Sequence, residues 1–428
     1  MRKISWRHLP PPVKKMVDCV SRAGALEGVL VYMVGGTVRD ILLKKRNVDL
    51  DCVVEGDAVA LAKRVASLVR GEVKIHGRFR TATVTDPDHV SVDFAMAREE
   101  NYPYPGSLPV VKPGTIAADL NRRDFTINAM AIALHGPDAG VLLDRHGGVR
   151  DLNRGFIRIL HDNSFIDDPT RILRGVRFEQ RLNFRFAPET AGVLKAALRH
   201  RVLARITPAR YFTDFRKVLK EDAALMCVRR LRRLGALDPF FKACPANERT
   251  LALIEKRRLK LPSYELGQGL DWALIRFMAV VDGVPLSEIE NFFQGVPLSR
   301  RERTLFVDSA GARTVVRLLS VKNMASSNIY DILKPLALEN ILFIRLWTSA
   351  KIVQRRVDVF LKMLRGVTLD ISGNDVKKAL GKRPSRLVGR VLEEALAQKL
   401  DGRCPDRDSQ LEWIRGRAGT IEYVKGGC

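Results

Sequence analysis

Two aspartates stand one residue apart in the run VDLDCVV, residues 48–54. If this run is a β-strand, Asp49 and Asp51 point to the same face, because side chains alternate between the two faces of a strand. Carboxylates placed in this way repel each other unless water solvates them or a cation bridges them, and Mg²⁺ prefers oxygen ligands. The spacing therefore indicates a magnesium site for phosphate chemistry. The alternative is an exposed strand edge.

Two adjacent glycines precede these aspartates, directly after the apolar run VYMV. Gly35 and Gly36 would let backbone N–H groups approach a phosphate closely, and the start of the helix-like segment that follows adds a favourable positive end. A tight turn without a ligand is the alternative, because a pair of glycines between a strand and a helix is a weak signal on its own.

A third aspartate lies in the strand-like run VSVDFAMA, among apolar residues where an unpaired charge is costly. Asp93 can complete a three-carboxylate site for one or two metal ions, an arrangement that stabilises the attacking and leaving oxygens in phosphoryl transfer. The alternative is an ion pair with Arg98 or another arginine.

The segment DLNRRDFTINAMA, residues 119–131, combines cations with a carboxylate and an amide. Arg122 and Arg123 are candidates for phosphate binding, because guanidinium groups match phosphate oxygens in charge and geometry. Asp124 can orient an arginine or cap the following helix, and Asn128 can reach a ribose or phosphate oxygen. An ordinary capped helix would show the same pattern.

A further helix is predicted after FIDD, with Asp168 as its N-cap and Pro169 as its first residue. Four arginines fall on one arc of this helix, which is more typical of a solvated or RNA-facing surface than of a catalytic site. They are Arg171, Arg174, Arg177 and Arg181.

Asp168 and Arg171 also suggest a way to select nucleobases. A carboxylate accepts hydrogen bonds and a guanidinium donates them. Cytosine and adenine each present an amino donor beside a ring acceptor, so this pair can satisfy either edge. Uracil and guanine present a carbonyl oxygen to the carboxylate instead. We therefore hypothesise that the pair selects C and A without a nucleic-acid template.

The elements that must position these residues fall into two parts. Short β-rich runs separated by Gly, Asp and Pro turns extend from residue 29 to about residue 160, with helical segments near 37–45 and 57–69. This pattern predicts a mixed α/β domain, preceded by a short amphipathic helix. Beyond residue 165, periodic Leu, Arg and Ala segments predict a long all-helical half.

Composition points to a large, strongly basic protein. The 428 residues carry a formal net charge of +25, which predicts about two to four domains and a polyanionic partner, most simply nucleic acid, rather than an inert basic surface. The six scattered cysteines contain no CxxC pair, which argues against a zinc site or a disulfide framework and fits a reducing cytosol. No window approaches eighteen uninterrupted apolar residues. We expect a cytoplasmic protein without a membrane segment.

Taken together, these motifs resemble the class II tRNA nucleotidyltransferase and bacterial poly(A) polymerase family. The resemblance depends on GGTVRD followed by DLD, on RRDFTINAMA, on LLDRHGGVRDL and on DDPTRILRGVRF, and it is strong from residue 30 to about residue 185. It implies an α+β fold. A polymerase-β-like nucleotidyltransferase head with a small mixed sheet would be followed by an all-helical neck, body and tail.

The resemblance also implies domain boundaries and residue roles. The implied domains are a helical leader (1–28), the catalytic head (29–160), a neck with the nucleotide-selecting motif (161–235), a body (236–365) and an RNA-binding tail (366–428). Asp49 and Asp51 would hold Mg²⁺ and act in catalysis, and the separate argument from the run VSVDFAMA adds Asp93 to the catalytic candidates. The nucleotide would be bound by Gly35, Gly36, Arg39, Asp40, Arg122, Arg123, Asp124, Asn128, Asp168, Arg171 and Arg174.

Two details complete the resemblance. Asp144, Gly148 and Asp151 match the motif thought to link the head and the neck. Asp167 stands where the family commonly shows Glu before the selecting aspartate, which leaves Asp168 and its arginine intact.

The leading expectation is an enzyme that adds CMP and AMP, from CTP and ATP, to the 3′ end of tRNA and releases pyrophosphate. The basic helical half would bind the acceptor arm, and no obligate protein partner is expected. CC-only addition, A-only addition and poly(A) synthesis are alternatives that share the head motifs. A non-catalytic RNA-binding protein is a further alternative, which the intact Asp49, Asp51 and Asp168 oppose.

Overall fold

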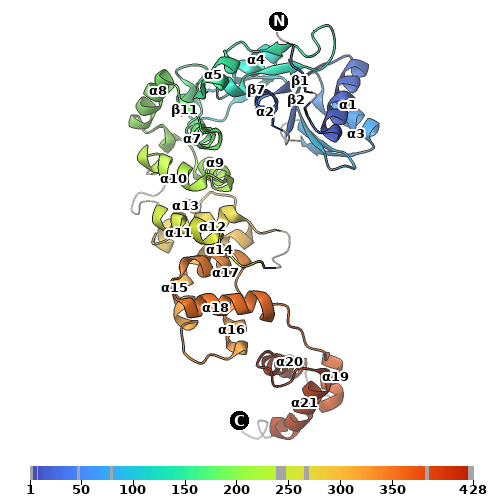
Figure 1. Ribbon diagram of the computed structural model, residues 1–428, viewed down its shortest axis with the longest axis vertical. Coiled ribbons are helices and arrows are strands. Elements are labelled where there is room, and N and C mark those ends of the chain that lie inside the picture. The colour runs from blue at the N-terminus through green and yellow to red at the C-terminus, as the bar shows by residue number, and fades with distance from the viewer. Residues whose placement is uncertain are drawn as a thin grey trace. The chain divides into compact units, whose positions relative to one another are not determined.

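The computed structural model describes residues 3–6, 8–45, 49–77, 81–237, 247–264, 269–380 and 385–422. The chain divides into two compact units, Met1–Lys242 and Ala243–Cys428. The first unit combines sheets with helices, and the elements described in the second are all helical (Figure 1). This confirms the predicted α+β class. The finer domain boundaries remain predictions.

A seven-stranded mixed sheet forms the centre of the first unit, in the order β3-β4-β5-β2-β1-β8-β9. Neighbouring strands are antiparallel except for β2 and β5, which run parallel and set Asp51 opposite Asp93. The strands are β1 (Leu30–Val34), β2 (Leu50–Glu55), β3 (Glu72–His76), β4 (Thr81–Thr85), β5 (Ser91–Met96), β8 (Ala131–Ala133) and β9 (Leu142–Leu143).

Short strand pairs and helices complete this unit. The strand pairs are β6 (Arg98–Asn101) with β7 (Val110–Pro113), and β10 (Phe156–Ile157) with β11 (Arg185–Phe186). The helices are α1 (Pro11–Glu27), α2 (Gly36–Leu42), α3 (Ala58–Val69), α4 (Ile116–Asn121), α5 (Gly148–Arg154), α6 (Ser164–Asp167), α7 (Thr170–Leu182), α8 (Pro188–Arg199), α9 (Pro208–Lys220) and α10 (Ala224–Arg233), with short 3₁₀ turns η2 (Thr126–Asn128) and η3 (Val202–Arg205).

The central sheet separates two cores, because successive side chains of a strand point to opposite faces. On one face, Val31 and Met33 of β1 pack in the cluster that includes the buried residues of α1 and α3, the neighbouring helices in Figure 1. On the other face, Tyr32 and Val34 pack with residues of α4. In β2 the alternation buries Leu50 and Cys52 in the first core and leaves Asp51 on the opposite face.

The second unit contains two groups of packed helices. In the first group, Phe277 of α12 packs against Phe293 and Phe306. In the second group, α19, α20 and α21 share a separate hydrophobic cluster. The helices are α11 (Glu248–Arg258), α12 (Trp272–Val280), α13 (Leu286–Phe293), α14 (Arg300–Ala310), α15 (Ala312–Leu318), α16 (Ser326–Leu333), α17 (Leu338–Trp347), α18 (Lys351–Val359) with the π-helical turn η4 (Phe360–Leu364), α19 (Gly373–Leu380), α20 (Ser385–Leu400) and α21 (Arg407–Glu422).

No helix within the described residues is long and apolar enough to cross a membrane. One predicted helix start differs from the structure. Helix α7 begins at Thr170, one residue later than expected, and Pro169 takes the N-cap position. The Asp168 carboxylate still accepts the Thr170 N–H at 3.1 Å, so it satisfies a donor of the first turn that has no partner within the helix.

Candidate active site

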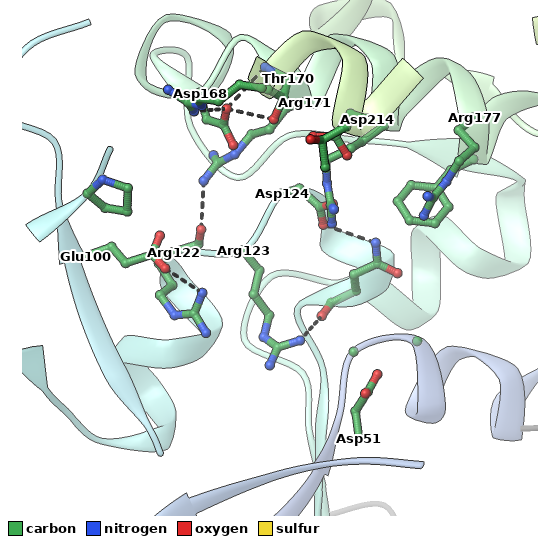
Figure 2. Close-up of a pocket in the computed structure, with 18 of the residues that line it drawn as sticks. Asp51, Glu100, Arg122, Arg123, Asp124, Asp168, Thr170, Arg171, Arg177 and Asp214 are labelled. Carbon is green, nitrogen blue, oxygen red and sulfur yellow. Dashed lines mark hydrogen bonds and ion pairs between the residues drawn. The ribbon is translucent and has the colours of Figure 1, made fainter. Parts of the chain in front are cut away.

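A cavity of about 750 Å³ opens in the first unit and contains nearly all the predicted site residues. Every one of them except Asp93 lines this cavity. Figure 2 shows Asp51 on one side of the cavity and Asp168 on the opposite side, with Arg123 and Asp124 between them. The sheet supplies the first side, and α7 and α9 supply the second.

The backbone of both aspartates is held by a residue of α2. Thr37, which is 1% exposed, donates its hydroxyl to the Asp49 carbonyl at 2.6 Å and accepts the Asp51 N–H at 2.8 Å. Asp49 immediately precedes β2, and Asp51 lies within it. Both line the same cavity, as expected if their side chains share one face of the strand. Thr37 therefore fixes the position of the paired carboxylates relative to the glycine turn.

Crowding of negative charge perturbs Asp51. The pKa of Asp51 is raised to about 6, mainly by burial and then by the charge of Asp93, with a smaller effect from Asp49. Arg123 and Arg39 act in the opposite direction. Desolvation and like charges both disfavour an ionised carboxylate. Asp51 is thus an acid whose ionised form would gain from a nearby cation.

Asp93 of β5 lies opposite Asp51 of β2 but is not part of the lining of the larger cavity. It lines a second cavity of about 320 Å³, which Asp51 also lines. Its carboxylate accepts a hydrogen bond from the Thr83 hydroxyl at 2.5 Å. The alternative that Asp93 pairs with Arg98 is wrong, because Arg98 pairs with Glu100 at 2.8 Å.

Within the described residues, no group of three or more His, Cys, Asp or Glu side chains is arranged to hold a metal ion. This differs from the predicted three-carboxylate arrangement. Of the three predicted carboxylates, Asp49 and Asp51 line the larger cavity, and Asp93 lines the neighbouring one together with Asp51. The chain therefore offers a pair of carboxylates there, and oxygens from outside the chain would have to complete a coordination sphere.

The glycine turn has a conformation that other residues rarely adopt. Gly35 has φ 63° and ψ −123°, and its N–H donates to the Met130 carbonyl at 3.1 Å. A Cβ at this position would come within 2.5 Å of Arg123 Nη1. Gly35 therefore leaves space for a guanidinium, whereas its own N–H is already used by the fold.

Arg39 and Asp40 form an internal ion pair in the wall of the cavity. Arg39 donates to Asp40 at 3.0 and 3.1 Å and to Asn128 Oδ1 at 2.7 Å. Burial tends to raise the pKa of Asp40, but Arg39 and then Lys45 outweigh it and lower that pKa. These contacts connect α2 to the segment that carries Asn128.

Asp124 orients an arginine, which confirms one of its two predicted roles. It binds Arg174 of α7 at 2.5 and 2.9 Å and accepts the Asn128 amide at 3.1 Å. Burial tends to raise the pKa of Asp124, but the Arg174 charge and the hydrogen bonds outweigh it and hold this pKa at about 2. The pair joins α7 to the segment before η2.

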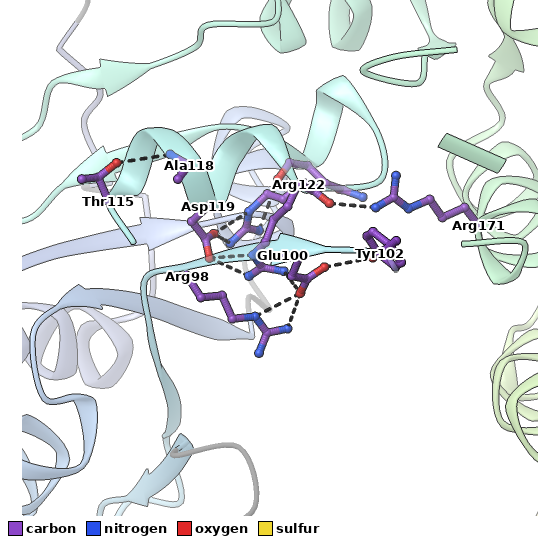
Figure 3. Close-up of polar contacts among 10 residues, drawn as sticks. Arg98, Glu100, Tyr102, Thr115, Ala118, Asp119, Arg122 and Arg171 are labelled. Carbon is purple, nitrogen blue, oxygen red and sulfur yellow. Dashed lines mark hydrogen bonds and ion pairs between the residues drawn. The ribbon is translucent and has the colours of Figure 1, made fainter. Parts of the chain in front are cut away.

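Arg122 and Arg123 are aligned by a carboxylate that the sequence reasoning did not single out. Asp119 is fully buried and accepts two hydrogen bonds from each arginine, at 2.6 to 3.1 Å. Figure 3 shows Glu100 beside Arg122, where it accepts from Arg98, from Arg122 and from the Tyr102 hydroxyl. Helical spacing of three and four residues could have revealed Asp119 as their partner.

Asp168 and Arg171 both line the cavity, where their roles in base selection stay a prediction, and the structure gives them different hydrogen-bond partners. Arg171 is 4% exposed and donates to the Ser164 hydroxyl at 2.7 Å and to the Arg122 carbonyl at 2.8 Å. The cation that contacts Asp168 is Arg210 of α9, at 2.9 Å. The predicted arc of four arginines also faces this cavity, because Arg171, Arg174, Arg177 and Arg181 all line it.

The DRHGGVRD segment, residues 144–151, is not part of the lining of the cavity. The Asp144 carboxylate accepts the Gly148 and Val149 N–H groups at 2.6 and 3.0 Å and so caps α5. Asp151, which is fully buried, accepts the Thr126 hydroxyl at 2.8 Å and Arg158 at 3.0 Å. Asp151 therefore joins α5 to η2, the turn that carries Asn128, and Asp144 stabilises the start of α5.

Two regions of the chain match protein-family models. Residues 31–158 match the Poly A polymerase head domain. Residues 183–247 match the probable RNA and SrmB-binding site of polymerase A. The first range contains the central sheet and the paired aspartates, and the second contains α8, α9 and α10.

Curated relatives match along most of the chain. The A-adding tRNA nucleotidyltransferase of Halalkalibacterium halodurans is 32% identical over 392 residues, which cover 90% of this chain and 88% of that protein. That of Geobacter sulfurreducens is 32% identical over 414 residues, covering 95% of this chain and 47% of the relative. That of Aquifex aeolicus is 34% identical over 369 residues, which cover 85% of this chain and 44% of the relative. The chain thus spans less than half the length of these last two relatives.

Solved structures match to a similar extent. A CCA-adding enzyme in its apo form II has a TM-score of 0.72 and 29% identity, with 97% of this chain and 100% of that chain covered. The Thermotoga maritima CCA-adding enzyme complexed with tRNA has a TM-score of 0.68 and 29% identity, with 97% of this chain and 98% of that chain covered. With the polymerase head match and the relative that is covered almost completely, these likenesses confirm the resemblance inferred from the motifs. The chain belongs to the family of class II tRNA nucleotidyltransferases.

Proposed function

We propose that this chain transfers AMP from ATP to the 3′ end of tRNA, with pyrophosphate as the leaving group. AMP addition is the step common to the names of the A-adding relatives and of the CCA-adding structural neighbours. The observation that carries the proposal is the composition of one cavity, which gathers the paired aspartates, the glycine turn, several arginines and Asp168.

Asp49 and Asp51 would hold Mg²⁺. The raised pKa of Asp51 supports this assignment, because a partly buried carboxylate crowded by like charges is stabilised when a cation binds. Mg²⁺ in phosphate-transferring sites commonly takes one or two carboxylates together with substrate oxygens, which fits a pair of protein ligands. When bound, Mg²⁺ supplies positive charge that favours ionisation of the attacking 3′-hydroxyl and stabilises the leaving pyrophosphate.

The chain's own residues would bind and orient the nucleotide. Arg122 and Arg123 would contact phosphate oxygens, since Asp119 holds both guanidinium groups in fixed orientations at the cavity. Asn128 would contact the sugar, although its side chain is already engaged by Arg39 and Asp124. Asp93 would contribute through its charge beside Asp51.

The tRNA would be bound mainly through its backbone. A formal net charge of +25 supports extensive phosphate contact, which supplies most of the affinity in nonspecific nucleic-acid binding. We assign the acceptor arm to the helical second unit and to the region of α8 to α10, which matches a probable RNA-binding family. Since tRNA and nucleoside triphosphates meet in the cytoplasm, we propose that the chain acts there.

Complete CCA addition is a second candidate function. The likeness to CCA-adding enzymes over 97% of this chain favours it, as does the cavity carboxylate Asp168. This carboxylate can accept a hydrogen bond from the amino group of cytosine as well as from that of adenine. The two candidates differ only in whether the chain also adds two CMP residues before AMP.

The test is incorporation of single nucleotides into three tRNA transcripts, which end at the discriminator base, after one C and after two Cs. Each nucleoside triphosphate is supplied separately. We expect addition of one A to the CC end, followed by arrest, and stepwise C addition to the shorter ends would extend the activity to complete CCA synthesis. Absence of A addition to the CC end would overturn the proposal. Unlimited A addition to unrelated RNA would identify a poly(A) polymerase instead.

A further inference from the structure

One oxygen of the Asp168 carboxylate is saturated with hydrogen bonds. Oδ1 accepts from the Thr170 N–H at 3.1 Å, from the Thr170 hydroxyl at 2.8 Å and from Arg210 Nη2 at 2.9 Å. Among the described residues, none of the hydrogen bonds reaches Oδ2. Because Asp168 lines the cavity, Oδ2 is the oxygen left to accept a hydrogen bond from a bound nucleobase.

Arg210 also holds the loop between β6 and β7. Its Nη1 donates to the Ser107 carbonyl at 3.3 Å and, in a shorter contact, to the Gly106 carbonyl. The Gly106 N–H donates to the Ile166 carbonyl at 3.1 Å, so the loop is also attached to α6. Leu108 of the same loop lines the cavity. A single guanidinium therefore connects α9, the loop and the carboxylate.

Arg171, the other residue of the predicted base-selecting pair, does not make this connection. Arg171 uses its two terminal nitrogens for the Ser164 hydroxyl and the Arg122 carbonyl. Arg210 is thus the arginine that contacts the carboxylate, although it is 42 residues distant in the sequence. Its Nη1 donates to the loop carbonyls and its Nη2 donates to Asp168. A planar guanidinium can make both contacts at the same time.

We propose that Arg210 is a positioning residue for base selection: it fixes Asp168 through Oδ1 and leaves Oδ2 to accept the amino group of adenine. A guanine would set its carbonyl oxygen against this acceptor. The inference rests on the proposed function, because it concerns the nucleotide that the cavity binds. It adds to that function a specificity-determining contact from α9.

Removal of Arg210 should relax selectivity more than it lowers overall activity. In Arg210→Gln, Asp168 loses its charged partner and keeps the two hydrogen bonds from Thr170, so it is held less firmly, and the loop loses the hydrogen bonds that join it to Arg210 of α9. A charge-assisted hydrogen bond has the strength to change a ratio of rates by about tenfold or more. We therefore expect the ratio of kcat/KM for ATP to that for GTP to fall by about tenfold.

The experiment measures kcat/KM for each of the four nucleoside triphosphates on a tRNA transcript that ends in CC. It compares the wild-type chain with Arg210→Gln, Arg210→Lys and the control Arg230→Gln. Arg230 likewise joins two helices through a carboxylate, Glu179, at 2.8 Å, and neither residue of that pair is in the lining of the cavity. Thermal unfolding of each variant verifies that it is folded.

We expect a relaxed ratio in Arg210→Gln, an intermediate ratio in Arg210→Lys and the wild-type ratio in Arg230→Gln. The lysine variant keeps a charge beside Asp168 but cannot reproduce both arms of the guanidinium, so it provides the test if the glutamine variant fails to fold. An unchanged ratio in the folded Arg210 variants would overturn the inference, even if all four rates fell together. A wild-type chain that adds no nucleotide would instead overturn the proposed function and this inference with it.

Discussion

Replacement of Asp51 by Asn should stabilise the metal-free protein while it removes activity. Asp51 lies on β2 beside Asp93, and burial and like charges raise its pKa from 3.8 to about 6. The substitution preserves the size of the side chain but removes the charge. It therefore isolates the electrostatic strain that this site imposes on the fold.

The expected magnitude follows from the difference in pKa. A folded-state pKa roughly two pH units above that of the unfolded chain corresponds to about 3 kcal/mol. Because the folded state binds this proton more tightly, the free energy of unfolding of the wild-type chain decreases as the pH rises from about 4 to about 6. Since Asp51 is only partly buried, we expect Asp51→Asn to gain about 1–3 kcal/mol at pH 7.5. Below about pH 4 the gain should vanish.

The chain has two units, so the assay must report on the unit that contains Asp51. Hydrogen exchange of the backbone amides of β1, β2 and β5 provides this information. It is measured at pH 4 and pH 7.5 in the presence of a chelator. Asp88→Asn, in the exposed turn between β4 and β5, is the control that removes a charge without relieving the crowding. Slower exchange in Asp51→Asn at pH 7.5 but not at pH 4 is expected. Faster exchange at pH 7.5, or a gain that does not depend on pH, would refute the reasoning.

Three further predictions concern the same unit. Gly35→Ala should lower the free energy of unfolding by about 1–3 kcal/mol, because its φ is positive, and should reduce AMP addition, since the new methyl group would displace Arg123. Gly192→Ala, which meets no atom within 4 Å, is the matched control in thermal unfolding. Asp124→Asn should destabilise the chain by about 3 kcal/mol at pH 7, because it leaves the Arg174 charge unpaired. This loss should shrink as the pH falls from about 4 toward 2, where the wild-type carboxylate is itself protonated, which acid unfolding curves of both proteins would reveal. Mg²⁺ should raise the melting temperature of the wild-type chain but not that of Asp51→Asn, as differential scanning fluorimetry would measure.

The residues that line the cavity could be predicted because their signals are local. Strand alternation placed Asp49 and Asp51 on one face, and the glycine pair marked the turn before α2. Helical spacing brought Arg171 and Arg174 to one arc. Each of these inferences needs only a few neighbouring residues and the period of a regular element.

The contacts between distant segments could not be predicted from the same signals. The order of the seven strands depends on tertiary packing, and the parallel pairing of β2 with β5 is what places Asp93 beside Asp51. Likewise, Asp168 contacts Arg210 rather than Arg171 because α9 packs against α7. Spacing within one helix contains no information about which arginine of a neighbouring helix faces its carboxylate.

The most direct test of the central claim is AMP transfer to a tRNA transcript that ends in CC, in the presence of Mg²⁺, by the wild-type chain and by Asp51→Asn. Pyrophosphate release and tRNA binding are recorded in parallel. The account predicts one AMP added and one pyrophosphate released per tRNA by the wild-type chain, and a rate at least about a hundredfold lower in the variant, with tRNA binding retained. Equal rates in the two proteins, or no transfer by the wild-type chain, would contradict it.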